Sequence, residues 1–435
     1  MTARPASRRT QQISWALADW AREPFFSIVL SLVLPPFFVA HVARDPVAGT
    51  AWWGYALTVA ALALVILAPL TGAIADGSER RKSWIAICAA VASLALLSLW
   101  FALGPPRWVL PVLALCVLAQ VGIELMRVFT DRLMPEVAAP EEIGRLSGLG
   151  IGLGFAASLI FLAALQLVER TAAGLAPGQI ERAAAAGTGL WLAVFMIPLL
   201  LFGPGRKNDA PVVRKPVAGG FRVHLAGVLL TLRSDRQLAR FLIARMAYWD
   251  GTMALFSFFA ILASTTLGWS TREMATFGLL GLLGGTTAGL LSGRIDARLG
   301  ARNTVIVSLA GMILCTIVLA SAAQVTAQAT HSGTQHPGFD TRADQVFLGM
   351  GVLASAFLGL IMSSSRSLLV RLAPAPRLGE YLGLYVMVGR ASSFLAPLLV
   401  AISTTLSGDQ RIGVFSVALV LLGLGVVLLS KVRRC

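Results

Sequence analysis

The chain alternates between long apolar runs and short segments rich in polar and basic residues. The apolar runs are long enough to cross a hydrocarbon core of roughly 30 Å as helices, which takes about 18 residues or more. They predict twelve membrane-spanning helices, near residues 14–40, 51–75, 83–103, 108–130, 145–168, 188–203, 238–266, 271–293, 303–325, 344–370, 381–406 and 411–430. We therefore expect an all-α membrane protein, with a tail at 1–13, a six-helix half at 14–203, a linker at 204–236 and a second six-helix half at 237–435.

The two halves share segments that indicate an internal duplication. RVFTDRLMP (127–135) aligns with RSLLVRLAP (366–374), each at the end of an even-numbered predicted helix. WALADW (15–20) aligns with MAYWDG (246–251), in the first predicted helix of each half. Chance similarity between apolar segments is the alternative. Because the matched segments hold equivalent places in the topology, we favour pseudo-symmetric halves, which in many transporters rock about a site at their interface.

Composition and charge exclude a water-soluble globular protein. Charged residues make up 13% and hydrophobic residues 57% of the 435 residues, whereas soluble proteins carry roughly a quarter charged residues. A net charge of +15 would suggest nucleic acid as a partner of a soluble chain. Here the Lys and Arg residues concentrate in alternate loops, so the positive-inside rule explains them and predicts cytoplasmic termini and a cytoplasmic linker. We expect a multi-pass protein of the cell inner membrane that binds no nucleic acid.

Ionisable residues inside the predicted helices are the first functional signal. They are Asp19, Arg22, Glu23, Glu124, Arg127, Arg245, Asp250, Arg366 and Arg390. A charge at mid-bilayer costs several kcal/mol, so it normally faces a partner or a water-filled cavity. These residues therefore predict a substrate or ion cavity. For the shallow residues Asp19, Arg22 and Arg127, ion pairing within one helix at i,i+3 or i,i+4 spacing is the alternative.

The loop GAIADGSERRK (72–82) joins predicted helices 2 and 3. It resembles the signature loop of the major facilitator superfamily, in which a glycine is followed by an aspartate and a basic cluster, although Glu79 stands where glycine is usual. GRIDARLGAR (293–302) is its counterpart in the second half. The resemblance implies gating loops that contain Gly72, Asp76, Arg80, Arg81, Gly293, Asp296, Arg298 and Gly300. A basic loop that only sets the topology is the alternative.

Several longer segments resemble one family within that superfamily. They are SWALADWAREPFF with LPPFF in helix 1, LARFLIARMAYWDG in helix 7, and SRSLLVRLAPAPRLGEYLGLY across helices 10 and 11. These segments resemble the vacuole effluxer family, whose fungal members export amino acids from the vacuole during autophagy. The resemblance implies the major facilitator fold, an amino-acid type of substrate, and a central cavity lined by helices 1, 4, 7 and 10. All of the intramembrane charges except Arg390 lie in those helices.

Glycines four residues apart predict faces where helices pack closely. Two sets are present, Gly144, Gly148 and Gly152 at the start of helix 5, and Gly281, Gly285, Gly289 and Gly293 in helix 8. The GLGIGLG run (148–154) opens a membrane helix with no preceding strand, which argues against dinucleotide binding.

No motif indicates an enzyme, a cofactor or a metal site. No Walker loop or nucleophile–base pattern is evident, and His41, His224, His331 and His336 lie outside the predicted helices. We therefore expect a secondary active transporter for a small polar solute, acting as a monomer in the lipid bilayer. Cavity charges of both signs suit a zwitterion such as an amino acid, and Glu23 and Asp250 are candidates to carry a coupling proton. A non-transporting assembly factor or lipid-handling protein on the same fold is the alternative.

Overall fold

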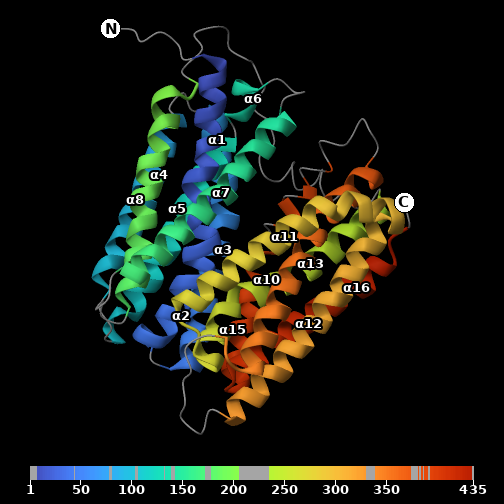
Figure 1. Cartoon of the computed structure of the whole chain (residues 1–435). Helices are drawn as coiled ribbons and strands as arrows, with labels where there is room; N and C mark the ends of the chain where they lie inside the picture. The colour runs from blue at the N-terminus through green and yellow to red at the C-terminus, as the bar shows by residue number, and fades with distance from the viewer. Residues whose placement is uncertain are drawn as a thin grey trace. The chain divides into compact units, whose positions relative to one another are not determined.

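The described part of the chain is helical throughout, without strands (Figure 1). A computed structural model describes residues 7–43, 45–77, 81–102, 106–131, 133–138, 143–171, 178–204, 235–329, 339–373, 381, 384–385, 387–389 and 392–433. The longer helices are α1 (Arg8–Pro24), α3 (Pro46–Gly77), α4 (Arg81–Ser98), α5 (Val109–Asp131), α7 (Ile143–Thr171), α8 (Gln179–Phe202), α10 (Arg236–Leu267), α11 (Thr271–Leu299), α12 (Ala301–Ala329), α13 (Arg342–Leu372), α15 (Leu395–Ser407) and α16 (Gln410–Ser430). The short helices α2 (Leu34–Phe37) and α6 (Met134–Val137) complete the set.

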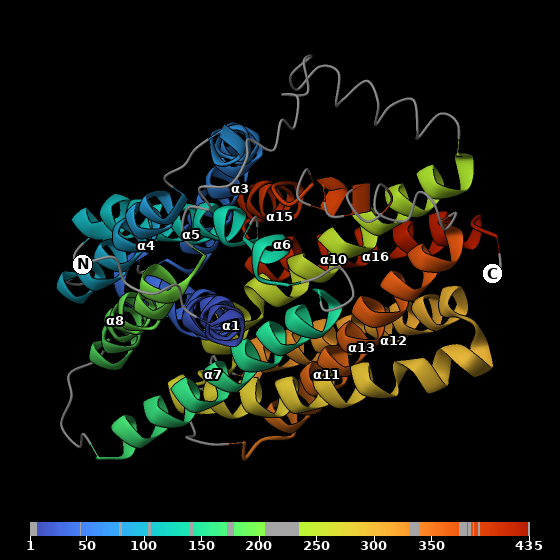
Figure 2. The same ribbon diagram turned by 90° about the horizontal axis from the view of Figure 1, so that it is seen from above.

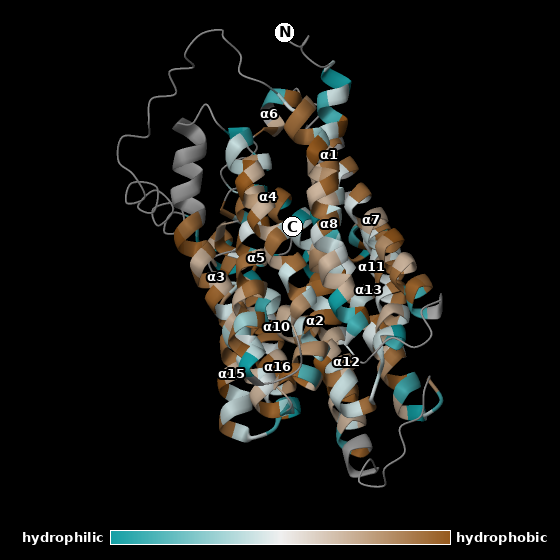
Figure 3. Ribbon diagram, turned by 90° about the vertical axis from the view of Figure 1, so that its left-hand side faces the viewer, coloured by the Kyte–Doolittle hydropathy of each residue, from teal (hydrophilic) through white to brown (hydrophobic). Residues whose placement is uncertain are grey.

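The described residues include 11 helices that are long and apolar enough to cross a membrane. A further apolar helix, α15, is shorter, and part of the predicted span 381–406 lies outside the described residues. Figure 3 shows hydrophobic residues along much of the length of the helices, and many large apolar side chains are exposed, among them Leu110, Leu290 and Leu406. Exposed apolar surface of this extent suits lipid contact, so the prediction of a multi-pass membrane protein is confirmed. The count of twelve stays a prediction.

The chain forms two compact units. The N-terminal unit comprises Met1–Arg44 and Val59–Lys215, and the C-terminal unit comprises Asp45–Thr58 and Pro216–Cys435. Helix α3 therefore contributes its first turns to the C-terminal unit and its later turns to the N-terminal unit. The predicted boundaries at 203 and 237 stay a prediction.

The first membrane helix is longer and less regular than predicted. It begins at Arg8, where Ser7 accepts a hydrogen bond from the backbone N–H of Thr10 at 3.2 Å and caps the helix. After Pro24 it continues as the wide π-helical turns Phe25–Val33, then α2, then the π-helical turns Phe38–Ala43. Prolines lack the amide donor of a regular α-helix, and π turns accommodate such interruptions. The prediction that His41 lies outside the helices is wrong, because its ring stacks on Phe37 within these turns, with 5.5 Å between centroids.

Helix α8 begins at Gln179, earlier than the predicted residue 188. Gly178 precedes it with φ 79°, in the left-handed region, and a Cβ at this position would lie 2.7 Å from the Phe37 ring. Glycine alone fits both constraints. Arg182, expected in a loop, therefore lies within α8, where the apolar pattern is diluted by alanines and Glu181. Mixed composition in the first turns hid the true start of this helix.

In the N-terminal unit, α4 lies between α5 and α8, and α1 lies against α7 and α8 (Figure 2). A Cβ on Gly122 of α5 would lie 3.2 Å from the Cys88 carbonyl, and one on Gly189 of α8 would lie 2.8 Å from the Ser93 carbonyl. These glycines allow both helices to approach the α4 backbone closely.

In the C-terminal unit, α10 packs along α16, and α13 packs against α11 and α12 (Figure 1). A Cβ on Gly251 of α10 would lie 2.8 Å from the Leu422 backbone nitrogen, and one on Gly425 of α16 would lie 2.5 Å from the Tyr248 Cβ. The predicted glycine face of helix 8 is confirmed at Gly285, where a Cβ would lie 3.0 Å from the Ser355 carbonyl. Gly293 is not part of this packing face, because a Cβ added there would have no described atom within 4 Å.

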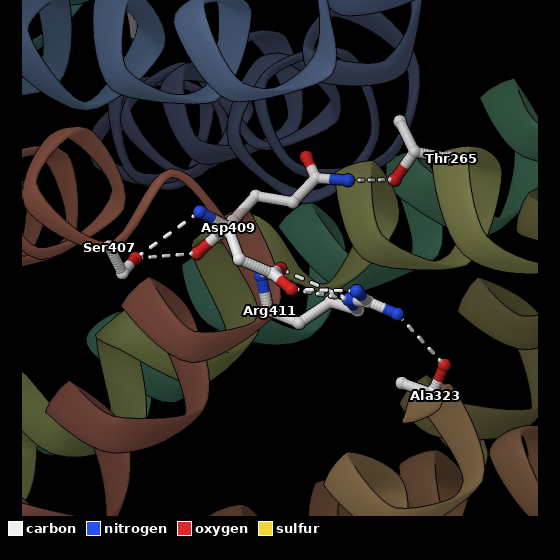
Figure 4. A network of polar contacts seen from close by, with 6 residues as sticks. Thr265, Ala323, Ser407, Asp409 and Arg411 are labelled. Atoms are coloured by element: carbon white, nitrogen blue, oxygen red, sulfur yellow. Dashed lines mark hydrogen bonds and ion pairs between the residues drawn. The ribbon is translucent and has the colours of Figure 1, made fainter. Parts of the chain in front are cut away.

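Polar contacts hold the turn between α15 and α16 (Figure 4). The Asp409 carboxylate caps α16 by accepting the backbone N–H of Arg411 at 2.8 Å, and it also accepts the Arg411 guanidinium Nη2 at 2.6 Å. Arg411 Nη1 in turn donates to the Ala323 carbonyl on α12 at 3.4 Å. The turn therefore links α16 to α12.

Gln410 links the same turn to two further helices. Its amide Nε2 donates to Thr265 Oγ1 on α10 at 2.6 Å, and its Oε1 accepts from Thr50 Oγ1 on α3 at 2.6 Å. A Cβ on Gly54 of α3 would lie 2.8 Å from the Pro397 carbonyl. This bond and this close contact explain why the first turns of α3 belong to the C-terminal unit.

Asp409 predicts a specific pH dependence of stability. Its hydrogen bonds from Arg411 hold the pKa of its carboxyl below the ordinary value. Such a group stabilises the fold above the unfolded-state pKa of about 3.9, and the stabilisation is lost as pH falls through the lower folded-state pKa. We expect Asp409→Asn to lower the melting temperature of the purified protein near neutral pH. Its difference from the wild type should stay constant down to about pH 5 and shrink below about pH 4.

The matched control is Asp340→Asn, because Asp340 is an exposed aspartate in the same unit. It should leave the melting curve unchanged at every pH. An Asp409→Asn difference of the same size at acid and neutral pH would show that this ion pair contributes nothing.

Candidate functional site

In the N-terminal unit, α1 carries a cluster of charged residues. Arg22 is 7% exposed and forms an ion pair with Asp19 one turn earlier, its Nε donating to Asp19 Oδ1 at 2.8 Å. Glu23 accepts a hydrogen bond from Ser27 Oγ at 2.9 Å. The pairing of Asp19 with Arg22 matches the intrahelical alternative. The two paired side chains place opposite charges beside the half-buried Glu23.

The charged face of α1 lies against glycines of α7. A Cβ on Gly150 would lie 2.5 Å from Asp19 Oδ2, and one on Gly154 would lie 3.1 Å from the Glu23 Cβ. The predicted packing face is wrong at Gly152, which has nothing within 4 Å. The glycines at 150 and 154 are also four apart but on another side of the helix. The surroundings of Gly144 and Gly148 lie outside the described residues.

Helix α5 contributes Glu124 and Arg127. Arg127 forms its ion pair with Asp131, Nε to Oδ2 at 3.6 Å, one turn further along the helix. It also interacts electrostatically with Glu124, Asp19 and Glu23. The charged residues predicted on helices 1 and 4 are therefore neighbours within the N-terminal unit.

In the C-terminal unit, Asp250 lies near the middle of α10 and is 1% exposed. Its Oδ1 accepts from Ser392 Oγ at a long 3.4 Å, and its Oδ2 is buried with no hydrogen-bond partner among the described residues. A buried carboxylate without a counter-ion costs free energy, so it needs a proton or a ligand to be satisfied.

Arg245 lies on the same helix and is 7% exposed. Its Nη1 donates to the backbone carbonyl of Tyr385 at 3.1 Å, and its Cζ lies 3.6 Å from the centroid of the Tyr385 ring. Arg245 and Asp250 do not form an ion pair with each other. Residues five apart on a helix are rotated by about 140°, so the two side chains leave α10 in different directions. Their interaction is electrostatic only.

Two predicted cavity residues remain, Arg366 and Arg390. Arg366 is exposed on α13. Arg390 lies outside the described residues. That Arg366 and Arg390 line a cavity therefore stays a prediction.

The first predicted gating loop is only partly described. Gly72 and Asp76 lie in the last turns of α3, but the surroundings of their side chains are not among the described features. Arg80 lies outside the described residues. Arg81, at the start of α4, forms an ion pair with Glu136 of α6. This pair ties two loops of the N-terminal unit together.

The second predicted gating loop is described in full. Asp296 is buried at the end of α11, and its Oδ1 accepts from Ser364 Oγ of α13 at 2.7 Å, while its Oδ2 has no partner in the described part of the chain. Gly300 ends the helix with φ 81°, and Arg298 is exposed. Asp296 therefore joins α11 to α13.

Several neighbours of the charged residues escaped sequence reasoning. Tyr385, Trp249 and Ser392 contact Arg245 or Asp250, and Gly150 and Gly154 adjoin the α1 cluster. The spacing of Trp249 four residues after Arg245 was a usable signal. Nothing in the sequence places Tyr385 or Ser392, which come from a distant segment. Among the residues described, no three His, Cys, Asp or Glu side chains group as metal ligands would.

Comparison with known proteins decides the family. The family described as "Vacuole effluxer Atg22 like" matches residues 39–435. The chain belongs to this family. YxiO, an uncharacterised transporter of the major facilitator type from Bacillus subtilis, is 27% identical. The match covers 97% of this chain and 94% of YxiO. Autophagy-related protein 22 of Cryptococcus neoformans is 25% identical over 66% of this chain, which spans 50% of that relative.

The fold agrees with this family. A D-xylose-proton symporter structure superposes with a TM-score of 0.68 at 14% identity, covering 98% of both chains. At that identity the likeness shows the fold alone. Together with the family, it confirms a membrane transporter of the major facilitator type.

Proposed function

We propose that the protein is a secondary active transporter that moves a small polar solute of the amino-acid class across the inner membrane by alternating access. The observation that carries the proposal is the Asp250 carboxylate, which is buried in the middle of a membrane helix with Oδ2 unpartnered. A charge kept at that depth opposes insertion by roughly 2–3 kcal/mol, so it serves a purpose other than folding.

Two further observations support this proposal. The N-terminal unit holds charges of both signs on α1, and the C-terminal unit holds both signs on α10, which suits a solute with a carboxylate and an ammonium group. The family itself is described as a vacuole effluxer family, and a protein of similar fold is a D-xylose-proton symporter. We propose that Glu23 and Asp250 are the sites for a coupling proton.

The experiment is a binding screen of the purified full-length protein against amino acids, sugars, nucleosides and phospholipids, read as a rise in melting temperature. A ligand that binds only the folded state raises that temperature. We expect amino acids to produce the largest shifts. Stabilisation by phospholipids alone would favour the lipid-handling alternative and contradict the proposal.

The proposed topology has a separate test. Both termini and the 204–236 linker are proposed to be cytoplasmic, because basic residues concentrate there. Reporter fusions after Lys82, within 206–236 and at the C-terminus should report cytoplasm, whereas fusions within 171–186 and 327–342 should report the opposite side. An external linker would contradict the six-plus-six arrangement.

Gly150→Ala tests whether the α1 cluster takes part in transport. The added Cβ would lie 2.5 Å from Asp19 Oδ2, so the carboxylate must move away from Arg22. Because only a side-chain end moves, we expect near-normal abundance but transport lowered about tenfold, as for loss of a charged hydrogen bond. The control is Gly152→Ala on the same helix, where the Cβ enters open space. Equal activity of both variants in proteoliposomes would remove the α1 cluster from the mechanism.

A further inference from the structure

Arg245 carries hydrogen-bonding capacity that the chain does not use. An arginine guanidinium has five N–H donors. One of them, on Nη1, donates to the Tyr385 carbonyl at 3.1 Å, while Nε is buried and has no acceptor among the residues that the structure describes. No carboxylate of the described residues lies within ion-pair distance of it. A buried positive charge in this state is unfavourable until an anionic group joins it.

Aromatic rings hold the guanidinium in one orientation. Its Cζ lies 3.6 Å from the centroid of the Tyr385 ring and 5.5 Å from that of Trp249. Phe241 of α10 also stacks against the Tyr385 ring, with 6.3 Å between centroids and an interplanar angle of 11°. Phe241, Arg245 and Trp249 follow at four-residue intervals, so they share one face of α10. Stacking and cation–π contact fix the plane of the guanidinium and shield it from water.

Gly389 makes room for this arrangement. A Cβ at that position would lie 3.0 Å from Nη2 and 3.1 Å from Cζ of Arg245, and closer still to Nη1. Any side chain there would displace the guanidinium. Residues from two separate segments, α10 and the stretch before α15, therefore surround a guanidinium that forms no ion pair with any described carboxylate.

We propose that Arg245 binds the carboxylate of a small organic solute, with the Tyr385 and Trp249 rings as the walls of the subsite. The planar guanidinium presents parallel N–H donors that match the two oxygens of a carboxylate. Asp250, with Oδ2 unpartnered, interacts electrostatically with Arg245. This assignment rests on the proposed transport function and names the residue that selects the acid end of the substrate.

The test compares acids with their amides on the purified full-length protein. Binding of the proteinogenic L-amino acids, of their α-carboxamides and of propionate and succinate is measured by calorimetry. We expect at least one amino acid to bind at least about tenfold more tightly than its carboxamide, the factor typical of a charged hydrogen bond. The preference should vanish in Arg245→Gln and fall only partly in Arg245→Lys, which keeps the charge but loses the planar fork.

Two controls separate recognition from folding. Arg240→Gln removes an exposed arginine from the same helix and should keep the full preference for the acid. Arg245→Gln should melt at the same or a higher temperature than the wild type, whereas a purely structural arginine would give a lower one. Gly389→Ala, which crowds a guanidinium that is still present, should weaken acid binding by at least about fivefold for the same physical reason.

The outcomes distinguish this assignment from the transport proposal. Equal affinity for acid and amide in the wild type, no binding of any carboxylate, or an unchanged preference in Arg245→Gln would overturn the assignment even if transport occurs. A preference for the acid without transport in liposomes would uphold the subsite and overturn the transport proposal. Tight binding of propionate or succinate without amino acids would keep the carboxylate subsite but change the class of solute.

Discussion

Asp250→Asn should abolish transport while leaving the protein as stable as the wild type or more stable. The carboxylate is buried with one unpartnered oxygen and one long hydrogen bond from Ser392. The amide has nearly the same shape but carries no charge and takes no proton. Removing an uncompensated buried charge relieves desolvation, whereas removing one member of a true buried ion pair costs about 3–5 kcal/mol. Because Arg245 forms no ion pair with Asp250, we expect the first outcome.

Asp344→Asn is the matched control for this substitution. Asp344 is also a buried aspartate in the C-terminal unit, but its carboxylate accepts from Trp269 Nε1 at 2.9 Å and from Thr341 Oγ1 at 2.6 Å. We expect Asp344→Asn to lower the melting temperature, because it replaces an acceptor with a donor facing Trp269 or Thr341, and to leave transport per folded molecule unchanged. Both variants are measured in proteoliposomes and by thermal unfolding in detergent. Normal transport by Asp250→Asn would remove this residue from the transport mechanism.

Gly425→Ala should be among the most destabilising single-methyl substitutions in the C-terminal unit. The new Cβ would lie 2.5 Å from the Cβ and 3.0 Å from the Cα of Tyr248, atoms that cannot move unless α10 moves. Overpacking of this kind costs about 1–3 kcal/mol. Because α10 also carries Arg245 and Asp250, a shift of this helix should lower transport as well as the melting temperature.

Gly423→Ala provides the comparison on the same helix. Its Cβ would meet nothing within 4 Å, so only helix propensity changes. Alanine is favoured over glycine inside a helix by roughly 0.5–1 kcal/mol, so this variant should melt at the same temperature or slightly higher. Similar melting temperatures for the two variants would show that α10 and α16 pack more loosely than this geometry requires.

The sequence predicts the helices well because the length of an apolar run is a local property. The positions of most membrane-spanning helices, and the assignment as a multi-pass membrane protein, follow from the apolar runs. Local composition misled at Gln179, where alanines and a glutamate begin a helix, and in the first helix, where prolines produce π turns that hydropathy does not register.

The candidate site is harder to predict because it depends on rotation about each helix and on distant contacts. Charge in an apolar run identified Asp250 and Arg245. Whether the two side chains meet depends on the direction in which each leaves the helix. A wrong direction of the same kind put Gly152 rather than Gly150 on the packing face of α7. The residues around Arg245 include Tyr385, which lies 140 positions along the chain. No local pattern predicts a contact of that kind.

The most direct test of the account is counterflow in proteoliposomes. Liposomes that contain the purified protein are loaded with unlabelled amino acids and diluted into a trace of the labelled mixture. We expect transient accumulation of label above that in protein-free liposomes, lost in Asp250→Asn and retained in Asp344→Asn. If monodisperse, folded wild-type protein accumulates no label from any amino acid, sugar or nucleoside mixture, the chain is not a transporter of small polar solutes.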